Sequence, residues 1–122
     1  MIVFDTGALI ALERRKQRAV QVWTTARKDQ LEIFVPGAVI AEWWRERTDV
    51  RERIVAGITI EPVGERLGRA AGEALAATPG ATVVDAIVMA LAARLGATVF
   101  TSDVDDLEEL RAFFPGVRVL SV

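Results

Sequence analysis

Short runs of strand-forming residues alternate along this chain with longer segments of helical pattern. Strands are expected at 1–4, 32–35, 58–63, 98–101 and 117–122. Helices are expected between them, at 6–14, 17–28, 36–47, 49–55, 64–77, 83–95 and 104–114. Alternation of this kind favours parallel strands, because a helical crossover returns the chain to the start of the next strand. The sequence therefore predicts a three-layer α/β/α sandwich around a parallel sheet of about five strands.

Turn and breaker residues support the same segmentation. Pro36 is expected in the first turn of a helix, Gly96 follows the helix that ends at Leu95, and residues 115–116 (Pro-Gly) close the helix before the last strand. The break at residues 78–80 (Thr-Pro-Gly) is too short to separate two domains. Because 122 residues is the length of one ordinary domain, we expect a single domain over 1–122.

Composition excludes several classes of protein. The longest apolar run, Ala86 to Ala93, is far shorter than the about 20 residues that span a bilayer, so no membrane helix is expected. Asp5 follows the first apolar residues directly, without the pattern of a secretory leader. The chain has no cysteine, which rules out disulfides and thiolate metal sites. A cytoplasmic location is the simplest interpretation.

Four acidic residues lie inside or at the end of apolar runs, in a chain without histidine: Asp5, Glu42, Asp85 and Asp103. A carboxylate placed where its neighbours predict burial costs free energy unless it is paired, hydrogen-bonded or bound to a cation. One explanation that fits all four is a metal ion held by oxygen ligands.

Three of these acids also have a plain structural explanation. Asp5 lies between a strand and a helix, where it can cap the helix. Asp85 comes three residues after Thr82 at a helix start, which is the spacing of a capping box. Asp103 opens a turn that also contains Asp106, and acids at a helix start are favoured by the dipole. For these residues capping and metal binding both remain open.

Glu42 is different, because its expected helix places it away from either end. Most of its neighbours in 38–44 are apolar, and a solvated face is normally richer in charge. The alternative is an outer-face ion pair with Arg45, worth only a few tenths of a kcal/mol. Glu42 therefore favours a functional role.

The carboxyl ends of parallel strands meet at one edge of a sheet, so Asp5 and Asp103 are expected to face one cleft. Converging carboxylates raise each other's pKa unless a cation such as Mg²⁺ or Mn²⁺ neutralises them. Such an ion suits phosphodiester hydrolysis, which needs no protein nucleophile. The hydroxyls of Thr6, Thr101 and Ser102 either position water or phosphate there or cap helices.

Four segments of the chain resemble the PIN domain, and within it the VapC-like ribonuclease toxins of toxin-antitoxin pairs. They are 3–10 (VFDTGALI), 39–42 (VIAE), 84–90 (VDAIVMA) and 99–103 (VFTSD). The resemblance implies a metal-dependent endoribonuclease that uses Mg²⁺ or Mn²⁺, an RNA substrate, a cognate antitoxin and a homodimer. Asp5, Glu42, Asp85 and Asp103 align with the family's four acids.

Two features depart from that pattern. Gly7 stands where a hydroxyl residue is frequent in the family, and Asp105 and Asp106 leave open which acids of the last turn reach a metal. Asp106 is the further candidate for a metal ligand. The tryptophans Trp23, Trp43 and Trp44 serve either the core or a contact with a second copy or an antitoxin.

Arginines are the expected contacts for RNA phosphates. Residues 1–60 carry 10 basic and 8 acidic groups, whereas residues 61–122 carry 5 and 9. Arg45 is the candidate beside Glu42 for positioning the substrate, and phosphate contacts would make affinity fall with salt. Solvated helix faces carry the same pattern, so the arginines alone do not predict RNA binding.

Two other functions fit the chain length and the acids. A phospho-receiver domain also places acids around Mg²⁺ at strand ends, but it needs a late lysine, and the only lysines here are Lys16 and Lys28. A catalytically silent PIN-like binding module, with its acids acting only as caps, is the second alternative.

Overall fold

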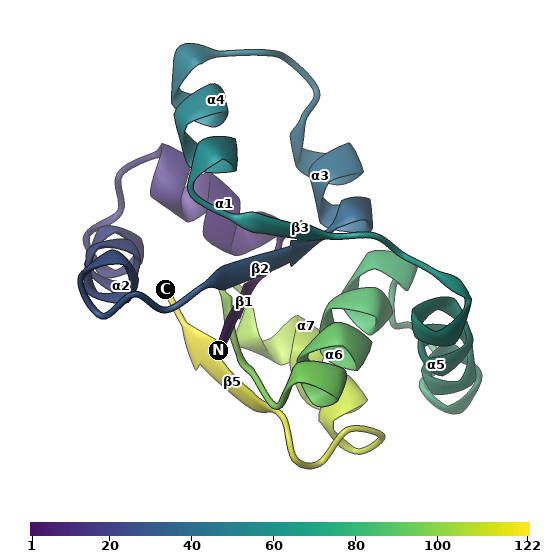
Figure 1. The fold of residues 1–122 in the computed structure, drawn as a ribbon. Coiled ribbons are helices and arrows are strands. Elements are labelled where there is room, and N and C mark those ends of the chain that lie inside the picture. The colour runs from purple at the N-terminus through teal and green to yellow at the C-terminus, as the bar shows by residue number, and fades with distance from the viewer.

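A computed structural model describes all 122 residues and contains one five-stranded, fully parallel sheet. The strand order is β3-β2-β1-β4-β5, so the first strand lies in the middle of the sheet (Figure 1). This confirms the predicted sheet. The strands are β1 (Ile2–Phe4), β2 (Ile33–Pro36), β3 (Thr59–Glu61), β4 (Thr98–Thr101) and β5 (Arg118–Ser121).

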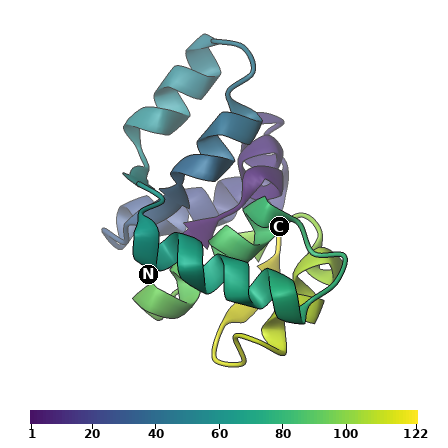
Figure 2. The ribbon, with the colours of Figure 1, turned by 90° about the vertical axis from the view of Figure 1, so that its right-hand side faces the viewer.

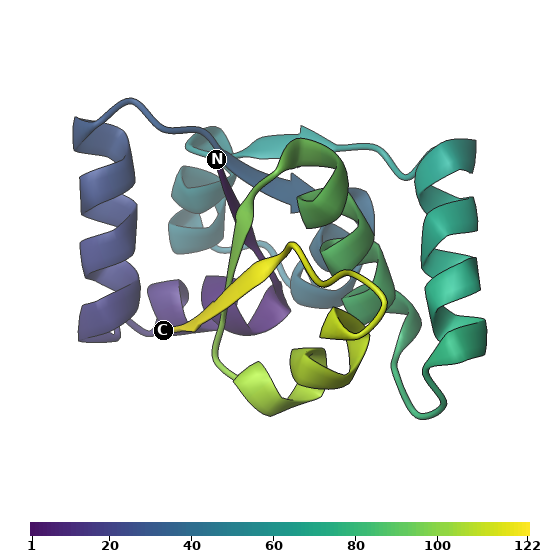
Figure 3. The same ribbon diagram turned by 90° about the horizontal axis from the view of Figure 1, so that it is seen from below.

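Seven helices connect the strands and complete the predicted α/β/α layers. Right-handed crossovers place α1 to α4 on one face of the sheet and α5 to α7 on the other. Helices α2 and α5 lie at opposite ends of the molecule (Figure 3). The helices are α1 (Thr6–Glu13), α2 (Gln17–Lys28), α3 (Gly37–Trp43), α4 (Asp49–Ala56), α5 (Glu65–Ala77), α6 (Val83–Leu95) and α7 (Val104–Arg111).

Helix α6 is the central helix of the hydrophobic core. All seven residues from 86 to 92 are buried, and the helix contacts β1, β2 and β4. The hydroxyl of Thr82 caps its first turn, and Gly96 ends it in the left-handed conformation at φ 64°. Val3 and Phe4 of β1 are also fully buried. The carboxyl end of β1 is thus held between two neighbouring strands and a packed helix.

Several boundaries differ from the sequence prediction. Pro36 ends β2 with extended backbone at ψ 150° instead of entering the helix. Because β2 stops there, β3 pairs only as far as Glu61. Helix α3 ends at Trp43 and not at residue 47, because Trp44 leaves the helical region at ψ 63°. The pair α3–α4 projects from one end of the molecule, with its connecting loop at the tip (Figures 1 and 2).

The strand order locates the edge at which a ligand would bind. The chain reverses direction across the sheet between β1 and β4, and open α/β sheets bind ligands at such a point. Receiver domains have the order 2-1-3-4-5, which is not the order found here. The topology therefore argues against the receiver alternative. None of the helices is long and apolar enough to cross a membrane.

Candidate metal centre

A cavity of about 380 Å³ lies at the carboxyl ends of β1 and β4, where the strand order reverses. None of its lining residues is hydrophobic, and none is basic. Five are acids, contributed by the start of α1, the end of α3 and the starts of α6 and α7. The lining residues are Asp5, Thr6, Gly7, Glu42, Thr82, Asp85, Thr101, Ser102, Asp103 and Asp106.

Asp5 is the most deeply buried acid of the cavity, with 6% of its surface exposed. It caps α1, accepting a hydrogen bond of 2.8 Å from the amide of Ala8. Burial raises the pKa of Asp5 to about 6, helped by the charges of Asp85 and Glu42 and opposed by hydrogen bonds from Thr101 and Ala8. Asp5 therefore caps α1 and lines the cavity at the same time.

Asp85 lies at the third position of α6, as the capping-box spacing predicted. Its amide donates to the Thr82 hydroxyl at 3.1 Å. Burial raises its pKa, a hydrogen bond with Thr82 lowers it, and the charges of Asp106, Glu42 and Asp103 raise it further. The pKa is therefore raised by both the fold and the surrounding acids.

Asp103 and Asp106 enter the cavity from the turn between β4 and α7. Asp103 occupies the cap position of α7, but its side chain makes no capping hydrogen bond. Its amide donates instead to the hydroxyl of Thr101 at 3.0 Å. The charge of Asp103 raises the pKa of Asp106, which is exposed. Capping therefore does not account for the Asp103 carboxylate, which remains available to a ligand.

Glu42 lies in the last turn of α3, where its carboxylate accepts a hydrogen bond from the Thr6 hydroxyl. It makes no ion pair with Arg45. A negative charge near the carboxyl end of a helix is unfavourable, because the helix dipole is negative there. Neither an ion pair nor the helix dipole explains an acid at this position. Its place in the lining of the cavity is the remaining explanation.

The structure brings together every acid and hydroxyl residue predicted for the site. Arg45, the predicted substrate contact, does not line the cavity and lies in the exposed loop after α3. Two lining residues were not predicted as site members, Thr82 and Gly7. Thr82 was recognisable only as a cap. Residue 7 has to be a glycine because a Cβ at this position would stand 2.2 Å from the Ser102 Oγ.

The donor set fits a hard divalent cation, because every polar lining side chain offers oxygen. No three acids gather into a closed set of ligands. Mg²⁺ does not need one, since it usually keeps several waters and is bound by one or two carboxylates together with substrate phosphates. A polar cavity of about 380 Å³ has room for such a hydrated ion. The residues therefore fit Mg²⁺, or Mn²⁺ with the same ligand preference.

A larger cavity of about 510 Å³ lies between α1, α2 and α4, and it has a different character. Its lining is mainly apolar, with Trp23 and Ile54 among its residues, and it carries three arginines, Arg15, Arg27 and Arg53. It contains none of the acids predicted for a metal. Of the two cavities, only the smaller one has the chemistry of a metal site.

Comparison with known families gives one match over most of the chain. A family model described as the PIN domain matches residues 2–112. No curated protein sequence matches the chain.

Solved structures with the same fold include three from bacteria. VapBC2 from Rickettsia felis, bound to a promoter DNA fragment, has 12% identity over 100% of this chain and 99% of that chain, with a TM-score of 0.81. VapC20 from Mycobacterium tuberculosis, a sarcin-ricin loop cleaving toxin, has 20% identity over 87% of this chain and 92% of that chain, with a TM-score of 0.69. A toxin-antitoxin complex from Klebsiella pneumoniae has 17% identity over 96% of this chain and 95% of that chain, with a TM-score of 0.67. At these identities the likeness concerns the fold.

Proposed function

This chain belongs to the PIN domain family, and on that premise we propose that it is a metal-dependent endoribonuclease and the toxin of a toxin-antitoxin pair. The observation that carries the proposal is the cavity at the β1–β4 edge, lined by five carboxylates and by no basic or hydrophobic residue. The sarcin-ricin loop cleaving toxin among the similar structures supports RNA as the substrate.

The site residues divide into ligands and groups that orient them. A divalent cation would be held among the five acids of the cavity, with one or two of them bound to it directly: Asp5, Glu42, Asp85, Asp103 and Asp106. When bound, such a cation would activate water for attack on a phosphodiester and neutralise charge on the phosphate. The hydroxyls of Thr101 and Thr82 orient Asp5 and Asp85 through the hydrogen bonds described above.

Substitution of one ligand tests the proposal. Asp85→Asn should abolish RNA cleavage in Mg²⁺ or Mn²⁺, while leaving thermal stability without metal equal to or above that of the wild type, because it removes like-charge repulsion. Cleavage of a fluorescent RNA library with and without EDTA gives the activity. Glu73→Gln, an exposed acid in the middle of α5, is the matched control.

Three results are informative. Loss of cleavage in Asp85→Asn and in EDTA, with the control fully active, supports the proposal. Full activity of Asp85→Asn and Asp5→Asn would overturn the catalytic assignment. Absence of any cleavage by the wild type, together with tight RNA binding, would favour the silent binding module.

A cognate antitoxin is the proposed partner, and the support is the toxin-antitoxin complex among the similar structures. The gene next to this one is the first place to look, because such pairs are encoded together. Co-expression of both chains should give a complex that is stable to gel filtration and inactive on RNA. Gel filtration of this chain alone tests the expected homodimer.

A further inference from the structure

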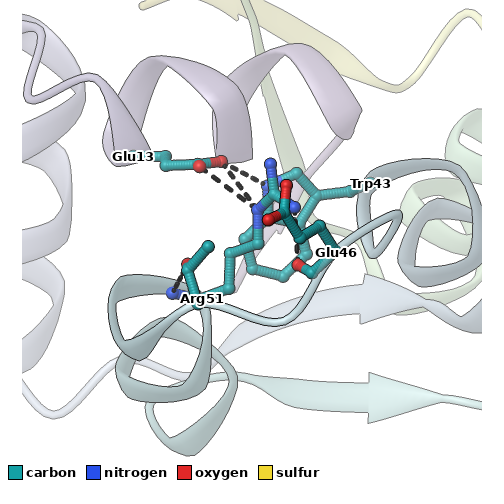
Figure 4. Close-up of polar contacts among 5 residues, drawn as sticks. Glu13, Trp43, Glu46 and Arg51 are labelled. Carbon is teal, nitrogen blue, oxygen red and sulfur yellow. Dashed lines mark hydrogen bonds and ion pairs between the residues drawn. The ribbon is translucent and has the colours of Figure 1, made fainter.

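The ends of α1 and α3 and the start of α4 meet in a partly buried polar network (Figure 4). Glu13, the last residue of α1, accepts a hydrogen bond of 3.0 Å from the indole Nε1 of Trp43, the last residue of α3. It also forms an ion pair of 3.2 Å with the Nε of Arg51, in the first turn of α4. We call Glu13, Trp43 and Arg51 the helix-end network.

This network contains the best shielded ion pair of the protein. The side chains of Arg51 and Glu13 are 19% and 23% exposed, whereas each of the other four ion pairs has at least one side chain above 40%. Exposed ion pairs contribute little, because solvent screens them. A shielded pair that also makes a hydrogen bond to an indole has one preferred geometry, so it fixes the helices that carry it.

Arg51 extends the network to the loop that joins α3 to α4. One guanidinium nitrogen donates to the backbone carbonyl of Glu46 at 2.6 Å, and the guanidinium carbon lies 5.8 Å from the centre of the Trp43 ring. The Arg51 amide donates to the Thr48 hydroxyl, which caps α4. The carboxyl end of α3 is therefore held by its neighbour helices and by the loop that follows it.

Glu42 depends on that end of α3, because it directly precedes Trp43. Helix α3 has only seven residues, and helices this short are not stable by themselves in water. Trp43 is buried with its indole nitrogen bonded to Glu13, whereas the adjacent Glu42 is exposed to the cavity. The side of the helix that packs thus sets the direction in which Glu42 points.

We propose that Glu13 and Arg51 are positioning residues, which hold Trp43 so that the adjacent Glu42 projects into the candidate metal centre. The consequence for catalysis rests on the proposed function, whereas the consequence for α3 does not. Small displacements of a catalytic group reduce rates by up to about a hundredfold. Neither Glu13 nor Arg51 lines the metal cavity, so their effect on cleavage has to act through Glu42.

Two measurements on Glu13→Gln and Arg51→Gln test the proposal, one of them independent of activity. Amide hydrogen exchange without metal should become at least tenfold faster at the end of α3, as at the Trp44 amide bonded to the Ile40 carbonyl. Gly96→Ala, which strains the far end of α6, is the control with a general loss of stability. In this control, the exchange rate at the end of α3 should stay unchanged relative to the rates in the other helices. Unchanged exchange in both network variants would overturn the proposal.

The second measurement is the rate of RNA cleavage at a temperature where every variant is folded. Both network variants should lower kcat tenfold to a hundredfold with little change in KM, and Gly96→Ala should retain wild-type kcat. Wild-type kcat in both network variants, or an equal loss in Gly96→Ala, would overturn the positioning role. If the wild type itself cleaves no RNA, the proposed function fails, and hydrogen exchange still decides the role of the network in α3.

Discussion

Asp5 combines two roles that the sequence presented as alternatives. It caps α1 through the Ala8 amide and also forms the buried floor of the acidic cavity. The cap explains why the residue is tolerated at the end of a buried strand, and burial explains why its pKa rises to about 6. A group that is harder to ionise in the folded state makes stability depend on pH.

The pKa of Asp5 predicts the sign of that dependence. Because the folded value of about 6 exceeds the ordinary value of 3.8, its favourable contribution is fully present below pH 3.8 and is lost as pH rises through 6. A rise of this size corresponds to about 3 kcal/mol. Urea denaturation in EDTA should therefore show a smaller fall in stability between pH 4 and pH 7 for Asp5→Asn than for the wild type. Identical pH profiles would contradict the burial effect.

Gly7 and Ser102 form a size-matched pair at the cavity wall. A methyl group at residue 7 would stand 2.2 Å from the Ser102 Oγ, so Gly7→Ala should destabilise by about 1 kcal/mol. Removing the hydroxyl relieves the closest contact, so Gly7→Ala with Ser102→Ala should regain that stability. Thermal denaturation of the two single variants and the double variant measures the coupling. Additive effects would show that the contact relaxes without cost.

At the scale of elements, local signals predicted where most helices begin and end. Thr82 and Gly96 bound α6 as expected, because capping and left-handed backbone are local properties. The end of α3 was misplaced by four residues, since no local breaker follows Trp43. What holds the chain there is the contact of Arg51 with the Glu46 carbonyl and with Glu13. Contacts between different helices leave no local pattern in a sequence.

Two glycines, one that ends a helix and one inside a helix, should respond in opposite directions to alanine. Gly96 has φ 64°, which strains any residue with a Cβ, so Gly96→Ala should destabilise by about 1 kcal/mol. Gly72 lies exposed in the middle of α5, and a methyl group added there would meet no atom within 4 Å, so Gly72→Ala should stabilise by about 0.5–1 kcal/mol. Chemical denaturation of both variants checks the signs, and equal signs would contradict the assigned backbone conformations.

At the scale of the whole molecule, the parallel topology assembles the site. Alternating strands and helices predicted a sheet whose edge collects Asp5 and Asp103, and both residues line the cavity at the paired ends of β1 and β4. Asp85 and Glu42 come from helices, so their approach to this edge was implied only by family resemblance. Closeness in sequence does not predict site membership, because Arg45 lies outside the cavity although it is only three residues from Glu42. Metal binding and the homodimer remain predictions.

Local stability should follow the same arrangement. The amides of β1, such as those of Val3 and Phe4, lie between two strands in the buried centre, so they should exchange only through global unfolding. The loop residues Arg45 and Arg47 are exposed and should exchange much faster. Hydrogen exchange followed by mass spectrometry measures both regions. Fast exchange in β1 would contradict its central place in the sheet.

The central position of β1 has a consequence for synthesis on the ribosome. Strand β1 pairs with β2 on one side, while its other partner, β4, is made more than ninety residues later. Until then one edge of β1 lacks its neighbour, and the acidic cavity lacks Thr101, Asp103 and Asp106. A nascent chain therefore cannot form the cavity early, and translation arrested before β4 leaves a fragment without the site. The order of synthesis delays any activity of this cavity until β4 and the start of α7 have been made.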